Sequence, residues 1–273
     1  MNIPEIIKNA FIFPSRNLET LSIYAILSVL SGAFIFEGVI TFLFGIADMS
    51  YFLVGGVYIA IAIIIGIITR SISIQCIKTG IELEEKLPDF KWWSSFNTGL
   101  NKIIITIFYF IVPAVIIVFI GLITNLFGNI LTVGDQIITQ VPVLLMKGNG
   151  LVDAVSFSLF PLFTSLAITI AAGLVIFLIF SFFQAMAEAK YAHTGSLKKA
   201  LNIYAALRDL KMIGVGKVIL VSMIIFVIVS CIQIVLTFIC DHLMVLSLLN
   251  IVITPYLALF GQRSLGLLYS DIV

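Results

Sequence analysis

The stretch IIITIFYFIVPAVIIVFIGLITNLF, residues 103–127, decides the fold class because it carries no charged side chain. A helix that crosses a bilayer needs about 20 consecutive, mostly apolar residues. Five further runs of this kind occupy residues 21–46, 52–74, 157–186, 218–240 and 243–259. We therefore expect an all-α fold, an integral membrane helical bundle with about six transmembrane helices.

The composition of the whole chain supports a membrane environment. Hydrophobic residues make up 61% of the sequence and charged residues 11%, whereas soluble domains contain roughly 25% charged residues. The formal net charge of +1 gives no reason to expect binding to nucleic acid. The sequence contains no catalytic motif, no cofactor motif and no metal-ligand spacing, so we predict no enzyme activity, no cofactor and no metal site.

The connections between the apolar runs predict the orientation of the chain. All of the 15 Lys and Arg residues except Lys147 fall on one side of the predicted spans. The positive-inside rule makes that side cytoplasmic, so both termini are expected in the cytoplasm of a multi-pass cell-membrane protein. The longest outer connection, residues 128–152, is apolar, and the sequence leaves open whether it lies on the membrane or caps the bundle.

Three cytoplasmic stretches have apolar residues at helical spacing with polar residues opposite them, namely residues 2–13, 87–100 and 196–211. Each precedes two predicted spans, which gives one membrane domain, residues 1–273, built from pseudo-repeats at about 1–80, 81–195 and 196–273. The pairs Thr79-Gly80 and Thr194-Gly195 end the first two units. We expect these amphipathic helices to lie in the membrane interface.

Small residues four positions apart predict where helices pack closely. Gly56 and Ala60, and also Ala62 and Gly66, share this spacing within the second predicted span. Small side chains at this spacing allow two helix backbones to approach in lipid. The second span is therefore expected to contact a neighbouring helix through these residues.

Three short segments carry a resemblance to a known family. They are Leu87-Pro88-Asp89-Phe90 with Trp93, Phe96 and Gly99-Leu100; Tyr191-Ala192, Thr194-Gly195-Ser196, Ala200 and Ile213-Gly214; and Arg263 with Gly266-Leu267-Leu268-Tyr269. In this order, across nearly the whole chain, they resemble the uncharacterised multi-pass membrane family called domain of unknown function 4013, found largely in methanogenic archaea. The resemblance implies a six-helix membrane protein of archaeal source and implies no activity.

A few polar residues within the apolar runs are candidate functional residues. Glu37 is the acid deepest in an apolar run, where it would bind a cation or relay a proton, or else lie near the outer interface or pair within the bundle. Four residues near inner helix ends are candidate lipid-headgroup contacts: Arg70, Arg263, Gln184 and Gln262. Trp92 and Trp93 are expected to be interfacial anchors.

Two functions follow from these patterns. The favoured one is a non-enzymatic module that organises lipids or partner proteins, because three amphipathic helices would lie among headgroups. Its expected partners are membrane lipids and other membrane or cytoplasmic proteins. The alternative is a transporter or channel for a small solute or ion, which would need a polar cavity at mid-membrane depth containing Glu37.

Overall fold

A computed structural model describes residues 1–45, 49–87, 91–147, 151–242 and 248–273 of the chain. The side chains of 139–147, 151–158, 241 and 242 are not part of this description, so the prediction for Lys147 lies outside it, as do those for Pro88, Asp89 and Phe90. Every secondary-structure element of the described residues is a helix, and these residues form no strand. Six of their helices are long and apolar enough to cross a membrane, which confirms the predicted all-α bundle.

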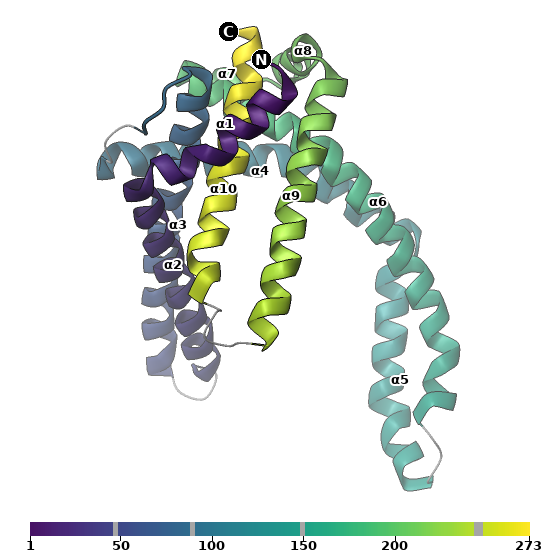
Figure 1. Cartoon of the computed structure of the whole chain (residues 1–273). Coiled ribbons are helices and arrows are strands. Elements are labelled where there is room, and N and C mark those ends of the chain that lie inside the picture. Colours follow the sequence, from purple (N-terminus) through teal and green to yellow (C-terminus); the bar gives the residue numbers. More distant parts are fainter. Residues whose placement is uncertain (46–48, 88–90, 148–150, 243–247) are drawn as a thin grey trace. The chain divides into compact units, whose positions relative to one another are not determined.

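The helices follow the predicted apolar runs and mostly extend beyond them (Figure 1). The six candidate spans lie in α2 (Leu18–Phe44), α3 (Met49–Ile81), α4 (Trp92–Ile123), α6 (Leu151–Thr194), α9 (Val215–His242) and α10 (Leu248–Tyr269). The remaining elements are α1 (Ile3–Arg16), α5 (Leu126–Lys147), α7 (Leu197–Ala200), α8 (Ile203–Ile213) and the short 3-10 helix η2 (Ser270–Ile272).

The chain forms two compact units. Unit 1 contains Met1–Thr106 and Phe183–Val273, and unit 2 contains Ile107–Phe182. Helices α4 and α6 therefore contribute to both units. The predicted single membrane domain stays a prediction, and each unit is described by itself below.

The core of unit 1 forms where α1, α2, α3 and α10 pack together. Its buried members are Phe13, Leu21, Leu27, Ile68, Ile72, Cys76 and Leu259. At the α3–α10 crossing, a Cβ atom on Gly80 would lie 2.8 Å from Gly266 Cα, so this contact needs glycine. Helices α2 and α3 approach at Gly55, where a Cβ would lie 2.9 Å from Gly38 O, whereas a Cβ on Gly56 would meet no atom within 4 Å. The close approach thus involves Gly55 and not the predicted Gly56. The predicted Ala62 does face α2, because its carbonyl accepts from Ser31 Oγ at 3.2 Å.

The two ends of the chain meet within unit 1. The Met1 amino group lies 2.7 Å from Asp271 Oδ1, so both termini occupy the same end of this unit (Figure 1). At the other end of α1, the buried Asn17 side chain donates to Phe13 O and to Glu85 O, each at 3.0 Å, and accepts from Leu87 N at 3.0 Å. Asn17 thereby attaches α1 to the connection that follows α3.

Unit 2 contains the connection that the sequence predicts on the outer side, residues 128–152, and its described residues are largely helical. Helix α5 begins at Leu126 and runs beside α6 (Figure 1). The Asn129 side chain donates to Pro161 O at 3.2 Å and to Ser165 Oγ at 3.1 Å. These bonds hold α5 to α6 and fix the first part of the connection within unit 2.

Element boundaries differ from the prediction in three places. Residues 92–100 form the first turns of α4 and not a separate helix, and residues 196–211 divide into α7 and α8. The division has a local cause, because Asn202 Oδ1 accepts from Ala205 N at 3.1 Å and caps α8. Helix α6 ends directly before Gly195, whose φ of +64° favours glycine. Helix α3 does not end at the corresponding Thr79-Gly80 pair but continues to Ile81. The threefold repeat therefore stays a prediction.

Candidate functional site

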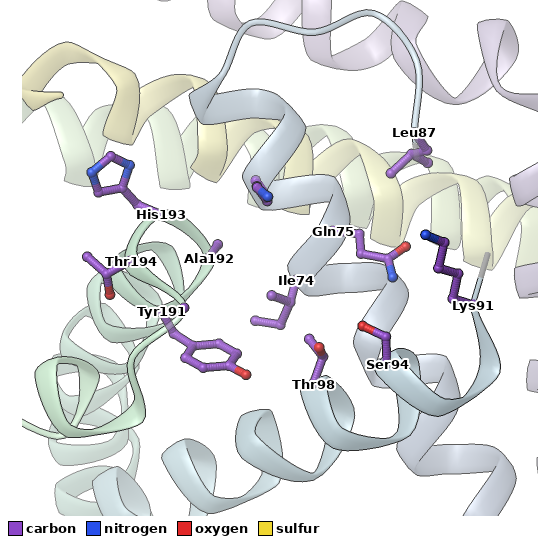
Figure 2. Close-up of a pocket in the computed structure, with 12 residues that line it drawn as sticks. Ile74, Gln75, Leu87, Lys91, Ser94, Thr98, Tyr191, Ala192, His193 and Thr194 are labelled. Carbon is purple, nitrogen blue, oxygen red and sulfur yellow. The ribbon is translucent and has the colours of Figure 1, made fainter. Parts of the chain in front are cut away.

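A basic cavity lies between the ends of three spanning helices in unit 1. It has a volume of about 810 Å³ and opens between α3, α4 and α6 (Figure 2). Its polar lining consists of Gln75, Lys78, Lys91, Ser94, Thr98, Tyr191, His193 and Thr194. We call this site the basic cavity. Its described lining residues include two lysines and several hydroxyl and amide groups but no carboxylate, which makes it suited to an anion. One of the lysines, Lys78, also lies 3.7 Å from Glu82 Oε1 on the same stretch of chain.

Hydrogen bonds between the helices shape the basic cavity. The Asn101 side chain of α4 donates to the Tyr191 hydroxyl of α6 at 2.8 Å. Gln75 of α3 donates to Ser95 Oγ of α4 at 3.4 Å. Gly99 of α4 packs directly against the Ile67 carbonyl of α3, where a Cβ atom would collide with the backbone. The walls of the cavity are therefore held before any ligand enters.

Buried charges lie on α4 and α6 close in sequence to the cavity residues. Lys102 Nζ lies 3.3 Å from Glu188 Oε2, and their side chains are 11% and 6% exposed. Gln184 Nε2 donates to Glu188 Oε1 at 2.8 Å and to Thr106 Oγ1 at 3.0 Å. A buried charge pair is tolerated when its remaining groups are also hydrogen-bonded. This cluster joins two candidate spans through ionised groups.

A second buried acid joins three elements of unit 1. Asp209 of α8 accepts from Lys190 Nζ of α6 at 2.8 Å and from the Tyr269 hydroxyl of α10 at 2.8 Å. The Asp209 and Lys190 side chains are 6% and 12% exposed. The cluster anchors α8 against the end of the bundle.

A smaller cavity contains Arg263, one of the predicted headgroup contacts. It has a volume of about 280 Å³ and is lined by residues of α1, α10 and the connection after α3. Arg263 is 5% exposed, and its guanidinium carbon lies 4.2 Å from the centre of the Phe13 ring. This stacking is a cation–π contact.

The structure places the four predicted headgroup residues in different surroundings. Gln184 belongs to the Lys102–Glu188 cluster, and Arg263 lies in its own cavity. Arg70 is exposed, and the side-chain oxygen of Gln262 is buried without a partner among the described residues. Which of them contact lipid stays a prediction.

The other predicted site residues lie on exposed helix surfaces. Trp92 and Trp93 begin α4 and are 63% and 87% exposed. Glu37 is exposed on α2 and does not line any of the cavities described here. Among the described residues, no group of three or more His, Cys, Asp or Glu side chains is placed to hold a metal ion.

Sequence reasoning missed the cavity lysines and Glu188. Lys78, Lys91 and Lys102 were counted only as loop charges that set orientation. Glu188 carried a usable signal, since it is an acid within the apolar context Met186-Ala187-Glu188-Ala189, four residues after Gln184. No local pattern indicates that it faces Lys102, because that contact depends on how α4 and α6 pack.

Six long apolar helices among the described residues make this a multi-pass membrane protein. The family described as "Protein of unknown function (DUF4013)" matches residues 54–240, well over half of the chain. The chain belongs to this family, which confirms the family predicted from sequence. The first two sequence segments lie within the matched residues, and the third, at Arg263, lies outside them. Searches among curated proteins and among solved structures find no match.

Proposed function

We propose that the protein is a membrane module that binds anionic lipid headgroups in the basic cavity. The observation that carries this proposal is a cavity of about 810 Å³ with Lys78 and Lys91, and no carboxylate, among its described lining residues. Lipid phosphate is anionic, and lysine binds it as a positive point charge. Cavities of this volume accommodate small ligands and headgroups.

The neighbouring tryptophans favour a lipid over a soluble anion. Trp92 and Trp93 directly follow Lys91 and are strongly exposed. Tryptophan concentrates at the level of the headgroups, where its ring meets apolar chains and its N–H meets water. If these rings mark the interface, the basic cavity opens at headgroup depth, where lipid phosphates are abundant.

The test compares two pairs of lysines that carry the same charge. The purified protein is incubated with phosphatidylglycerol or phosphatidylcholine of equal chain length, and bound lipid is counted by native mass spectrometry. We expect preferential retention of phosphatidylglycerol. A Lys78→Gln/Lys91→Gln double variant should weaken its binding by about tenfold to thirtyfold, since each lysine near a lipid surface contributes about 1 kcal/mol.

The control pair is Lys198→Gln/Lys199→Gln, on the exposed surface of α7. We expect it to change binding by about threefold or less, because exposed charges are screened by salt. An equal loss in both double variants would mean that surface charge, and not the cavity, attracts the lipid. No preference for phosphatidylglycerol in the unmodified protein would refute the proposal outright.

The alternative function, transport of a small solute or ion, draws support from the buried Lys102–Glu188 pair. Ionised groups within spanning helices often mark ion or proton routes. The role predicted for Glu37 lacks such support, because its exposed side chain lies outside the cavities described here. Flux into proteoliposomes that is lost in a Glu188→Gln variant would move the assignment to transport.

A further inference from the structure

The cavity at Arg263 is separate from the basic cavity and shares no lining residue with it. Its walls include Asn9, Phe13 and Arg16 of α1, Leu83 and Glu85 of the connection after α3, and Arg263 of α10. The Arg263 cavity measures about 280 Å³, which is room for a small anion or one headgroup. The inference below therefore does not rest on the proposed function.

Arg263 is a buried cation with unused hydrogen-bond donors. It is 5% exposed, and its Nε and Nη1 atoms are buried without a hydrogen-bond partner within the described ranges. A guanidinium group stays protonated in proteins and presents five N–H donors. Leaving a buried charge without partners costs several kcal/mol. The ring of Phe13 stacks on one face of the Arg263 guanidinium. The N–H groups lie in the plane of the guanidinium, so the ring accepts none of them.

The part of the chain that the structure describes supplies no ion-pair partner for Arg263. Among the ion pairs between described residues, Arg263 takes part in none. Glu85, the acid that lines this cavity, instead lies 3.1 Å from Arg16, and both side chains are more than half exposed. The cavity thus holds two arginines and one acid, and that acid is already paired.

We propose that the Arg263 cavity binds a phosphate-type oxyanion, with Arg263 at its buried wall and Arg16 in the exposed part of its lining. The planar donors of arginine match the oxygen spacing of phosphate groups. Such a ligand would satisfy the unused N–H groups and offset the buried charge. The oxyanion comes either from free phosphate or from a phosphomonoester lipid headgroup, and the two sources require different probes.

The experiment measures thermal unfolding of the full chain in neutral detergent. One arm titrates inorganic phosphate against chloride at equal ionic strength, and the other titrates phosphatidic acid against phosphatidylcholine in mixed micelles. We expect a saturable rise in the unfolding temperature in one arm, which identifies the source. Arg263→Lys should weaken this effect by about tenfold, because lysine keeps the charge but loses the planar set of donors.

Three further variants make the result decisive. Lys199→Gln removes an exposed cation of α7 outside both cavities and should respond like the unmodified protein. Lys78→Gln/Lys91→Gln should respond normally to inorganic phosphate. In the phosphatidic acid arm it should lose the share of binding due to the basic cavity and keep the rise that depends on Arg263, which separates the two sites. Arg16→Gln alters an exposed side chain, so it should fold even if Arg263→Lys does not, and should weaken the effect by about threefold.

Two results would overturn the proposal. The first is the absence of stabilisation in both arms, which would mean that water alone occupies the cavity. The second is an equal response in the unmodified protein, Arg263→Lys and Arg16→Gln, which would place the bound anion elsewhere.

Discussion

Helices α4 and α6 are joined in both units, but by different chemistry. In unit 1 the bonds between them include the ion pair of Lys102 and Glu188, with Gln184 and Thr106 completing its contacts, beside the neutral bond from Asn101. In unit 2 the Thr124 and Thr169 hydroxyls meet at 3.2 Å. Among the described contacts, an ion pair thus joins these helices in unit 1, where further polar partners surround it, and a pair of neutral hydroxyls joins them in unit 2.

The two kinds of contact should differ most when one partner is removed. A hydroxyl that loses its partner can still bond to its own helix, and Thr124 Oγ1 and Thr169 Oγ1 already do so with Ile120 O and Ser165 O. Lys102 has no such local substitute, since its ammonium group must find an anion or water. Loss of one charged partner should therefore destabilise the fold more than loss of one hydroxyl.

The largest effect is expected from Glu188→Leu. This variant leaves the ammonium group of Lys102 buried without its anion, which should lower the free energy of unfolding by about 3–5 kcal/mol. Helix content followed during titration with sodium dodecyl sulfate measures the change. The double variant Lys102→Met/Glu188→Leu should recover most of the loss, because it removes both charges. A loss of less than about 1 kcal/mol in the single variant would show that water reaches Lys102.

An intermediate effect is expected where glycines allow backbones to touch. Gly80→Ala in unit 1 places a Cβ 2.8 Å from Gly266 Cα and 3.0 Å from Arg263 O, and backbone atoms cannot easily move aside. We expect a loss of about 1–3 kcal/mol in the same titration. In unit 2, Gly173→Ala meets only the tip of the Ile117 side chain at 3.3 Å and should cost less.

Gly56→Ala is the matched control on the same helix as Gly80. Its added Cβ would meet no atom within 4 Å, so stability should stay unchanged or rise slightly because alanine favours helix. Equal losses at Gly56 and Gly80 would contradict the close crossing of α3 and α10. A larger loss of unfolding free energy in Gly173→Ala than in Gly80→Ala would contradict the expectation that helices pack more closely at the unit 1 glycine.

The spans could be predicted from sequence because lipid imposes a local rule on every stretch that crosses it. About 20 apolar residues are needed whatever the neighbouring helices are, and residues 103–127 satisfy this alone. Interhelical contacts follow no such rule. Gly55 and Gly56 differ by one position, but one helical residue turns the chain by about 100°, and this rotation decides which glycine faces α2.

The candidate sites were predictable only in part for the same reason. Lys102 stands directly before an apolar run, a position that is typical of the last residue of a loop. Helix α4 nevertheless begins before Lys102 and continues through it. Glu188 and Arg263 become informative once packing shows that one has a counter-charge and the other has none. Sequence reasoning identified Arg263 by its residue type, and the fold supplied its cavity and its unused donors.

The smallest effect is expected from Thr169→Val in unit 2. The threonine hydroxyls lie 3.2 Å apart, but each also bonds to a carbonyl of its own helix, so their mutual bond should contribute about 0.6 kcal/mol. A double-mutant cycle with Thr124→Val isolates this coupling from the loss of the local bonds. The same cycle on Lys102 and Glu188 should give a coupling several times larger. If the threonine pair instead coupled by about 2 kcal/mol or more, neutral hydroxyls would bind helices as strongly as ions do here, and the contrast between the two units would fail.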